Sequence, residues 1–361
     1  MGDGFYKDVS GLVHLAGGLE MPLEKQQGII TPNADFFICH DAPTPVIAGE
    51  GWSLSVEGDA VTSPLRLTRA DLEAMEQVTL PVLIECAGNH RQLFEDVMGE
   101  PLNRRPHVTE LRWHLGGLGM AEWQGVRLAD VLTMAGISDE AHHVMPVGLD
   151  RGREGVDGIR MPMPVAKATH PDTLIALRMN DETLPPDHGF PARTIVPGWV
   201  GTYSIKWLDR IEVTREHRWV ERNTERYVLM GEAWDANDYA PAKGPLITKH
   251  PLRSSLALPW PATLTPGPQR LRGYARGAEE PIVRVTWSAD KGATWQDAEL
   301  LSPCDRYAWV EFAFTWDATP GDHALMTRAY DAAGDSQALD QPFNNGGYVY
   351  AMVHPHAVAV A

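Results

Sequence analysis

The sequence predicts an α+β protein in which a mixed α/β region, residues 1–240, is followed by an all-β sandwich, residues 241–361. The chain has 361 residues, more than a single hydrophobic core usually holds. Short apolar runs alternate with helix-like segments up to about residue 230. Beyond residue 238, apolar and polar residues alternate in runs that are separated by turn residues, and this pattern is typical of strands.

The first region combines strand and helix signals. Residues 1–50 are rich in Gly, Pro and Asp, and we expect them to wrap the surface. The segment VTLPVLIEC, residues 78–86, is predicted to be a buried strand, and ARTIVPGWV, residues 192–200, is a similar apolar run. LADVLTMAG, residues 128–136, has the spacing of an amphipathic helix. This mixture favours an α+β or α/β domain.

The second region follows a Pro-rich polar segment, residues 239–252, which we interpret as a linker. Residues 282–288 alternate at period 2, and residues 290–292 supply a turn. Residues 309–316 and 323–330 are further runs of the same kind. Short strands with Gly, Asp and Pro turns predict a β-sandwich. Because no Cys…Trp…Cys pattern occurs, it would be an immunoglobulin-like sandwich without the disulfide.

Charge and cysteine content limit the function. The net charge of −17 argues against nucleic acid or an anionic membrane as a partner, although a local basic pocket could still hold a small anion. No apolar stretch is long enough to span a bilayer, and the N-terminus does not resemble a signal peptide. The three cysteines do not form a disulfide framework. We therefore expect a cytoplasmic protein, or a periplasmic one if a leader has been removed.

Cys86 is the first candidate for chemistry. It ends an apolar strand and is followed, after Ala87, by Gly and Asn, so it should project into a loop. A thiolate suits a soft or high-valent metal, and Arg91 could lower the thiol pKa and attract an anion. The alternative is a buried structural cysteine.

The second candidate is a set of three cations, His188, Arg193 and Lys206, interleaved with Gly and Pro. Side chains and exposed backbone N–H groups of this composition can bind a phosphate. Because the segment contains neither GxGxxG nor GxxxxGK[ST], an ordinary nucleotide loop is not indicated. The alternative is a set of solvated surface charges.

Aromatic residues and histidines are weaker candidates. Tyr227 stands beside an arginine and could donate to a substrate oxyanion, and Trp113 could form an aromatic wall, but both could equally be core residues. The histidine pairs 142/143 and 354/356 lack the spacing of known zinc motifs, so the sequence does not favour a zinc site.

Four ordered motifs together resemble the sulfite oxidase family, which includes plant nitrate reductases and bacterial sulfite dehydrogenases. They are CAGNHR at 86–91, Trp113 with AEWQGVRLADVL at 121–132, MNDETLPPDHGFPAR at 179–193, and VPGWVGTYSIKWL at 196–208. The C-terminal β region resembles the dimerisation domain of that family. The resemblance covers nearly the whole chain and implies a molybdopterin cofactor that carries molybdenum.

The resemblance also implies roles for individual residues. Cys86 would be the thiolate ligand of molybdenum. The residues that match cofactor-binding segments are Phe37, Cys39, Asp150, His188, Arg193, Ser204 and Lys206. Arg91, Trp113 and Tyr227 match the walls of a substrate oxyanion pocket.

Two departures from the family pattern concern that pocket. Where the family has FFxRNH, this chain has FFICHD, so Cys39 replaces an arginine, and His40 and Asp41 replace Asn and His. An arginine that the family supplies near residues 309–314 is absent, and Glu311 and Phe312 stand there. Two cations are therefore expected to be missing, unless His40 or Arg112 compensates.

The sequence thus predicts a molybdenum-cofactor oxidoreductase that transfers an oxygen atom to or from a small oxyanion. Sulfite oxidation to sulfate is the leading reaction. The electron acceptor would be external, for example a c-type cytochrome, because no haem or flavin motif is recognisable, and the protein would be a homodimer. The alternatives are a reductase of nitrate or of an S- or N-oxide, and a non-catalytic molybdopterin-binding protein.

Overall fold

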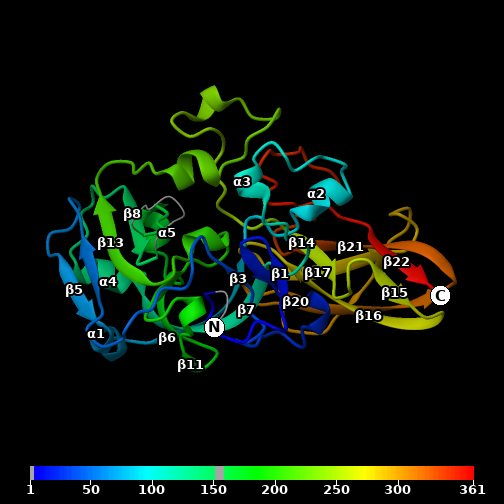
Figure 1. Cartoon of the computed structure of the whole chain (residues 1–361), viewed down its shortest axis with the longest axis horizontal. Helices are drawn as coiled ribbons and strands as arrows, with labels where there is room; N and C mark the ends of the chain where they lie inside the picture. The colour runs from blue at the N-terminus through cyan, green and yellow to red at the C-terminus, as the bar shows by residue number, and fades with distance from the viewer. Residues whose placement is uncertain (1–3, 151–157) are drawn as a thin grey trace.

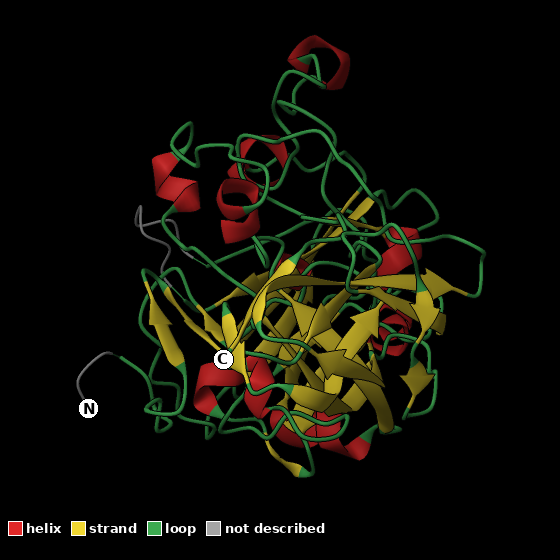
Figure 2. Cartoon of the chain, turned by 90° about the vertical axis from the view of Figure 1, so that its right-hand side faces the viewer, coloured by secondary structure: helices red, strands yellow, loops and turns green. Residues whose placement is uncertain are grey.

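The computed structural model describes residues 4–150 and 158–361. The molecule is elongated, and Figure 1 shows β5, β8 and β13 towards the left and β14–β22 towards the right, with β1 in the middle of the view and the C-terminus at the right-hand end. Short helices lie around the outside of the packed strands (Figure 2). The mixed α/β architecture predicted for the first half is confirmed by this arrangement.

Two five-stranded sheets form the first half. One has the order β11-β10-β7-β6 with β12 also paired to β10, and the other has the order β5-β4-β13-β8-β9. The strands of the first sheet are β6 (Val78–Glu85), β7 (Leu118–Arg127), β10 (Leu174–Met179), β11 (Glu182–Thr183) and β12 (Arg193–Ile195). Those of the second are β4 (Ser53–Glu57), β5 (Leu65–Thr68), β8 (His143–Gly148), β9 (Met163–Pro164) and β13 (Leu208–Thr214).

Helices of the first half are short and pack on these sheets. In α4 (Leu128–Met134), Leu128, Val131 and Leu132 are buried on one face, which is the i, i+3, i+4 spacing that predicted the helix. In α1 (Arg69–Ala74), Thr68 is the N-cap and forms a capping box. The remaining helical segments are α2 (Gln92–Asp96), α3 (Pro106–Thr109), α5 (Val165–Ala168), η1 (Leu23–Lys25), η2 (Pro186–His188), η3 (Gly201–Tyr203), η4 (Arg222–Arg226) and η5 (Ala236–Tyr239).

Two further sheets form the C-terminal half, with the orders β14-β16-β20-β19 and β15-β22-β21-β17-β18. Their strands are β14 (Arg253–Leu256), β15 (Ala262–Leu264), β16 (Gly267–Arg276), β17 (Ile282–Ser288), β18 (Gln296–Asp297), β19 (Glu299–Leu300), β20 (Val310–Ala318), β21 (Gly321–Asp331) and β22 (His356–Val360). One apolar core holds side chains from both sheets, among them Leu271, Phe312 and Val285. The strands expected near residues 282, 309 and 323 are present as β17, β20 and β21. The immunoglobulin-like assignment and the boundary at 240/241 stay predictions.

The expectation that residues 1–50 only wrap the surface is wrong. They form a small antiparallel sheet of β1 (Val13–Leu15), β2 (Gly18–Glu20) and β3 (Ile38–Cys39). Phe36 is buried against Trp123 of β7, and Ile38 is buried against Leu12 and Leu19 of the same N-terminal segment. This segment therefore brings Cys39 into the interior. Within the described residues, no helix is long and apolar enough to cross a membrane.

Candidate functional site

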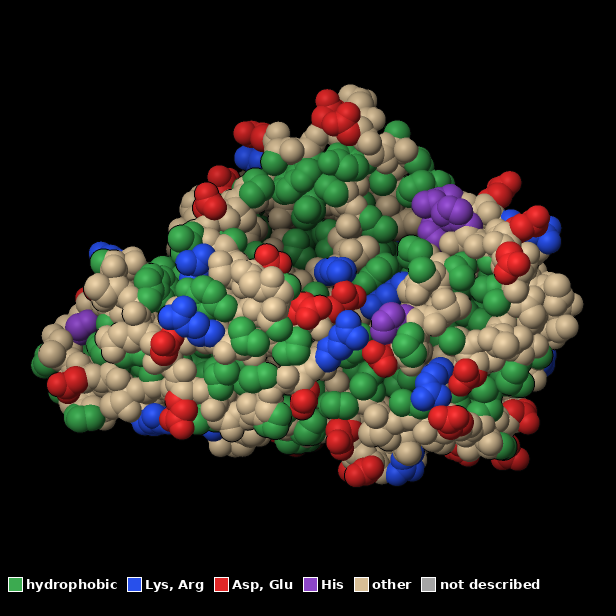
Figure 3. Space-filling view, turned by 180° about the vertical axis from the view of Figure 1, so that it is seen from behind, with side chains coloured by type: hydrophobic (Ala, Val, Ile, Leu, Met, Phe, Trp, Pro, Cys, Tyr) green, Lys and Arg blue, Asp and Glu red, His purple; other side chains and the backbone are tan. Residues whose placement is uncertain are grey.

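A cleft opens between β3, the end of β6, and the segments on both sides of β13. A hollow is visible on the back face of the molecule, with acidic and basic side chains beside it (Figure 3). The predicted residues that line this cleft are Phe37, Cys39, Cys86, Asp150, His188, Arg193, Ser204, Lys206 and Tyr227. Residues that the sequence separates by up to 190 positions thus meet at one site.

The loop that carries Cys86 is fixed by hydrogen bonds. The Cys86 N–H donates to Gly117 O at 2.9 Å, and Asn89 Oδ1 accepts from the Gly117 N–H at 3.0 Å. A side chain at position 88 would collide with Arg91, because a Cβ there would lie 2.5 Å from Nη2. Glycine at 88 thus allows the guanidinium to lie against the cysteine loop.

The carboxylate of Glu85, directly before Cys86, is fully buried. It pairs with Arg276 and, at 3.2 Å, with Arg253, and it accepts from Asn89 Nδ2 at 2.7 Å. Both arginines belong to the C-terminal sheets, on β16 and β14. The end of β6 is therefore held by charges from the other half of the molecule.

Cys86 lies beside a second thiol, Cys39. The Cys39 S–H donates to Cys86 sulfur, and this bond, with smaller contributions from Arg91 and the Gly88 N–H, lowers the pKa of Cys86 to about 7. The same interaction, together with burial, raises the pKa of Cys39 well above its usual range. At neutral pH Cys86 is thus substantially ionised, which is the form that binds a metal.

The three residues predicted to be cations converge on one end of the cleft, but only two of them are charged, because burial lowers the pKa of His188 well below its usual range and leaves it neutral. Arg193 donates to His188 O at 2.9 Å and to Ser204 O at 3.0 Å, and its guanidinium lies over the Trp123 ring. Lys206 Nζ donates to Cys39 O and Asp187 O at 3.3 and 3.2 Å. Backbone carbonyls thus orient the two side chains towards the cleft.

The electrostatics of this end fit an anionic ligand. Burial lowers the pKa of Lys206 to about 7 and that of Arg193 to about 9. Neither forms an ion pair with a carboxylate of the described residues, and Arg193 Nε has no hydrogen-bond partner among them. Two buried cations without a paired carboxylate are costly, and a phosphate would restore their usual pKa values. The residues present therefore fit the phosphate of a pterin cofactor.

The other predicted cofactor residues surround the same space. The Asp150 carboxylate accepts from the Ile159 N–H at 3.1 Å, and burial raises its pKa. Ser204 Oγ accepts from the Val196 N–H at 3.2 Å. Phe37 is buried and contributes an apolar wall. The cleft thus offers a carboxylate, a hydroxyl and a ring to a flat polar ligand.

A second, smaller cavity adjoins the first and shares Cys39, Cys86 and Tyr227 with it. Arg91 lines this cavity, where its guanidinium donates to the carbonyls of Leu111, Gly346 and Gly347 and lies over the Tyr348 ring. Burial raises the pKa of Tyr227, so its hydroxyl keeps its proton at neutral pH. This cavity therefore presents a cation and a hydroxyl donor next to the Cys86 thiol.

Trp113, predicted to be a wall of this pocket, lines neither cavity. Its indole is fully buried and packs edge-on against the Phe37 ring, with 5.9 Å between the ring centroids. It lies in an apolar cluster that also includes Cys39 and Cys86. Trp113 thus supports the cysteines from behind and does not face the cavity.

Two arginines that sequence reasoning missed also lie at this site. Arg222 lines the larger cavity and Arg226 the smaller. Arg222 pairs with Asp41 and donates to Tyr227 Oη at 3.4 Å. Arg226 donates to both carboxylate oxygens of Asp41, at 2.8 and 3.0 Å. The sequence signal was the pair of basic residues just before Tyr227, and what it could not give was their pairing with Asp41.

Neither His40 nor Arg112, the two residues considered as alternatives, replaces the missing arginine. Burial lowers the pKa of His40 well below its usual range, so His40 is neutral, and its Nε2 bonds Asp187 O. Arg112 pairs with Glu95 at the surface. Glu311 forms an ion pair with Arg272 and, like Phe312, lines neither cavity. The added positive charge comes from Arg222 and Arg226, and Asp41 offsets part of it.

Comparison with known proteins agrees with this site. The model of the oxidoreductase molybdopterin binding domain matches residues 41–220. Sulfite oxidase of Gallus gallus is 33% identical over 323 residues, which are 85% of this chain and 68% of that protein.

The chain belongs to the sulfite oxidase family. At the level of the family, this confirms the predicted oxidoreductase class and the predicted molybdopterin cofactor.

Other members differ in length and detail. Mitochondrial sulfite oxidase of Mus musculus is 34% identical over 79% of this chain, and the match covers 52% of that protein. The chain thus spans about half the length of several curated sulfite oxidases. The crystal structure of the sulfane dehydrogenase SoxCD from Paracoccus pantotrophus superposes with a TM-score of 0.81 over 97% of this chain and 86% of the other. At 23% identity, that likeness concerns the fold.

Proposed function

We propose that the protein is a molybdenum-dependent oxidoreductase that oxidises sulfite, or a related small oxyanion, by transfer of one oxygen atom, with an external electron acceptor. One observation carries the proposal. The Cys86 thiol borders both cavities, and its pKa is lowered to about 7. A metal held by this thiolate would lie between a basic pocket for the cofactor and a cavity that offers Arg91 and Tyr227 to an anion.

When bound, the molybdenum cofactor supplies the two-electron redox step and the oxygen transfer. His188, Arg193 and Lys206 would bind its phosphate, and Asp150 would accept hydrogen bonds from the pterin ring. Arg91 would hold a substrate oxygen by charge, while Tyr227, protonated at neutral pH, would donate to another. The apolar backing of Phe37 and Trp113 limits water around the thiolate.

One observation favours a second function, the reduction of nitrate or of an S- or N-oxide on the same cofactor. The position at which the family has an arginine carries Cys39, and Asp41 pairs with both Arg222 and Arg226. The loss of a positive charge weakens the binding of a dianion more than the binding of a monoanion or a neutral oxide.

Assays with the purified protein distinguish these functions. Metal and pterin analysis should give about one molybdenum and one pterin per chain. Sulfite with ferricyanide or a c-type cytochrome as acceptor tests oxidation, and reduced viologen with nitrate, an S-oxide or an N-oxide tests reduction. Turnover of sulfite supports the proposed oxidation. Turnover only of nitrate, an S-oxide or an N-oxide supports the reductase function. If the protein contains the molybdenum cofactor but turns over none of these substrates, it is a non-catalytic molybdopterin-binding protein.

A further inference from the structure

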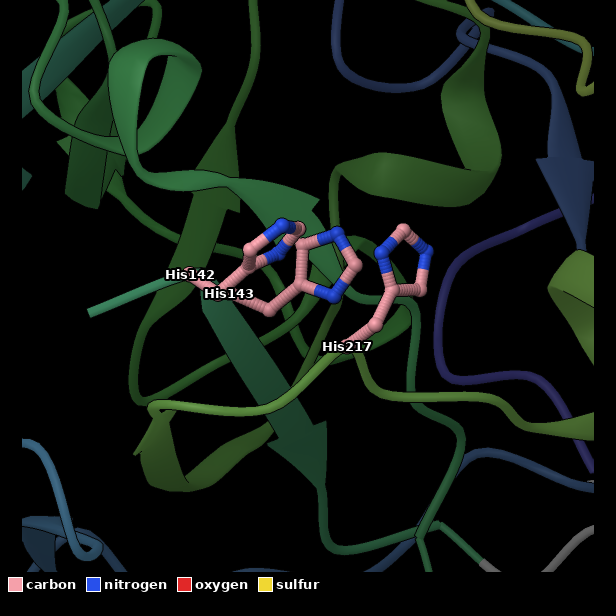
Figure 4. A group of neighbouring side chains, drawn as sticks. All are labelled: His142, His143 and His217. Atoms are coloured by element: carbon pink, nitrogen blue, oxygen red, sulfur yellow. The ribbon is translucent and has the colours of Figure 1, made fainter. Parts of the chain in front are cut away.

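Three histidines meet on the surface at the end of β8 and β13 that is remote from the cleft. His143 begins β8, His142 directly precedes it, and His217 follows β13. Thr214 is paired with His143 in the antiparallel ladder, so the chain beyond β13 turns back over the start of β8. One ring nitrogen from each histidine lies within 4.8 Å of the other two. The three rings lie side by side in Figure 4.

Sequence motifs did not favour a metal site at His142 and His143. The third histidine, His217, is 74 positions beyond His143 and comes close to the pair only in the folded chain. His142 and His217 are exposed, and histidine side chains gather in a patch on the back face of the molecule (Figure 3). The His217 ring stacks on Trp219, with centroids 4.0 Å apart. This stacking restricts the His217 side chain, so less rotamer freedom would be lost on ligation.

The charges around the cluster permit a cation to bind. Neutral imidazole is the form that binds a metal. Nearby arginines are already paired, Arg218 with Glu212 and Arg215 with Glu140, so they add little repulsion.

We propose that His142, His143 and His217 form a binding site for one divalent transition-metal ion, separate from the cofactor cleft. Three nitrogen ligands without carboxylate or thiolate suit Zn²⁺, Ni²⁺ or Cu²⁺ better than Mg²⁺ or Ca²⁺. Water would complete the coordination sphere. β8 runs from His143 to Gly148, so the ion would lie about 20 Å of strand away from Asp150 and the cleft.

Binding requires two small rearrangements. Metal–nitrogen distances of about 2.0–2.1 Å place tetrahedral ligand atoms about 3.3 Å apart, so the rings must approach each other. His143 Nδ1 now accepts from the Arg218 N–H at 2.9 Å, so its proton is on Nε2. For ligation through Nε2, that proton must move to Nδ1 and this one hydrogen bond is lost. The segment that carries His217 and Arg218 is not part of a strand or helix and can shift.

The ion would have a structural consequence. The segment from 215 to 221 leads directly into η4, which carries Arg222 and Arg226. An ion bound to His142, His143 and His217 would fasten the start of this segment to β8. It would thereby limit the movement of a segment that lines the proposed substrate cavity.

The test is calorimetric titration of the molybdenum-loaded protein, without a histidine tag, with Zn²⁺, Ni²⁺ and Cu²⁺ in turn. We expect one ion per chain with a dissociation constant in the micromolar range. His142→Ala and His217→Ala should each weaken binding at least tenfold. His14→Ala, at an exposed histidine on β1, is the matched control and should leave binding unchanged.

Electron paramagnetic resonance of the Cu²⁺ complex provides an independent readout. Coupling to three nitrogens is expected in the unchanged protein and to two in either variant. Absence of binding at about 100 μM ion, or equal affinity in the two variants and the control, would overturn the proposal.

Discussion

The guanidinium of Arg226 donates one hydrogen bond to each carboxylate oxygen of Asp41, at 2.8 and 3.0 Å, across 185 positions of sequence. Arg222 pairs with the same carboxylate. A single negative charge is therefore shared by two arginines at the wall of the proposed substrate cavity. Four predictions follow from this arrangement and from the neighbouring cysteines and lysine, and a fifth concerns assembly.

Asp41→Asn should strengthen sulfite binding. The amide keeps the size of the side chain and removes its charge, so Arg222 and Arg226 can attract an anion. We expect the KM for sulfite to fall about tenfold, which corresponds to on the order of 1.4 kcal/mol. Steady-state kinetics measure the KM for sulfite, and Asp322→Asn on β21 is the control variant. An unchanged or higher KM would mean that Asp41 does not limit anion binding.

Cys39→Arg should also favour sulfite, because it restores the residue of the family motif at a position that lines both cavities. A charged hydrogen bond contributes roughly 1.5–3 kcal/mol, so the KM should fall about ten- to a hundred-fold. Sulfite kinetics across pH test this, and Cys304→Arg at an exposed cysteine is the matched control. If neither KM nor kcat changes, position 39 does not face the substrate.

Cys86→Ser should abolish turnover and leave the fold and most of the bound pterin in place. The basic residues that would hold the phosphate, Arg193 and Lys206, are separate from the thiolate. Activity assays, circular dichroism and pterin fluorescence measure the three properties, with Cys304→Ser as the control. Full activity in the Cys86 variant would refute its role as the metal ligand.

The free energy of unfolding of the cofactor-free protein should increase as the pH rises from 7, because Lys206 is buried in the folded state. Its pKa in the folded protein, about 7, is below its unfolded value near 10.5. Between these values the unfolded chain binds more protons, so stability increases with pH by up to about 1.4 kcal/mol per unit. Urea unfolding from pH 7 to 9 measures this slope. Lys206→Met should flatten it, and an equal slope in that variant would contradict the assignment.

The protein is expected to form a two-fold homodimer through residues after about 245. Exposed apolar side chains in that half include Val283, Leu301 and Leu339, and two-fold symmetry is the commonest closed form. Light scattering should give twice the monomer mass of 39.8 kDa. A stable monomer at micromolar concentration would count against this prediction.

Local patterns predicted local structure well. The spacing of Leu128, Val131 and Leu132 was enough for α4, and alternation was enough for β17. Ordered motifs also predicted that Cys86, His188, Arg193 and Lys206 would lie together. In each case the information lies within a short segment, or in several segments that occur in a familiar order.

Relationships that depend on tertiary packing could not be predicted. Nothing in the order of residues indicates that Asp41 pairs with Arg226 or that His217 lies beside His143, because the packing of loops and helices decides both distances. Trp113 was expected at a cavity wall, but its indole is fully buried, since the large ring fits behind the cysteines. The prediction that residues 1–50 wrap the surface was based on amino-acid composition, which does not indicate which of these residues are buried.

The pairing of Glu85 with Arg253 and Arg276 has a consequence for how such proteins can be recombined. If the first half were expressed alone or grafted onto a foreign partner, a buried carboxylate next to Cys86 would lose both counter-charges, a change that typically costs about 3–5 kcal/mol. An exchange of C-terminal halves between relatives would therefore succeed only where the incoming half supplies arginines at these two positions. The first half thus depends on the C-terminal half to neutralise the carboxylate next to its proposed metal ligand.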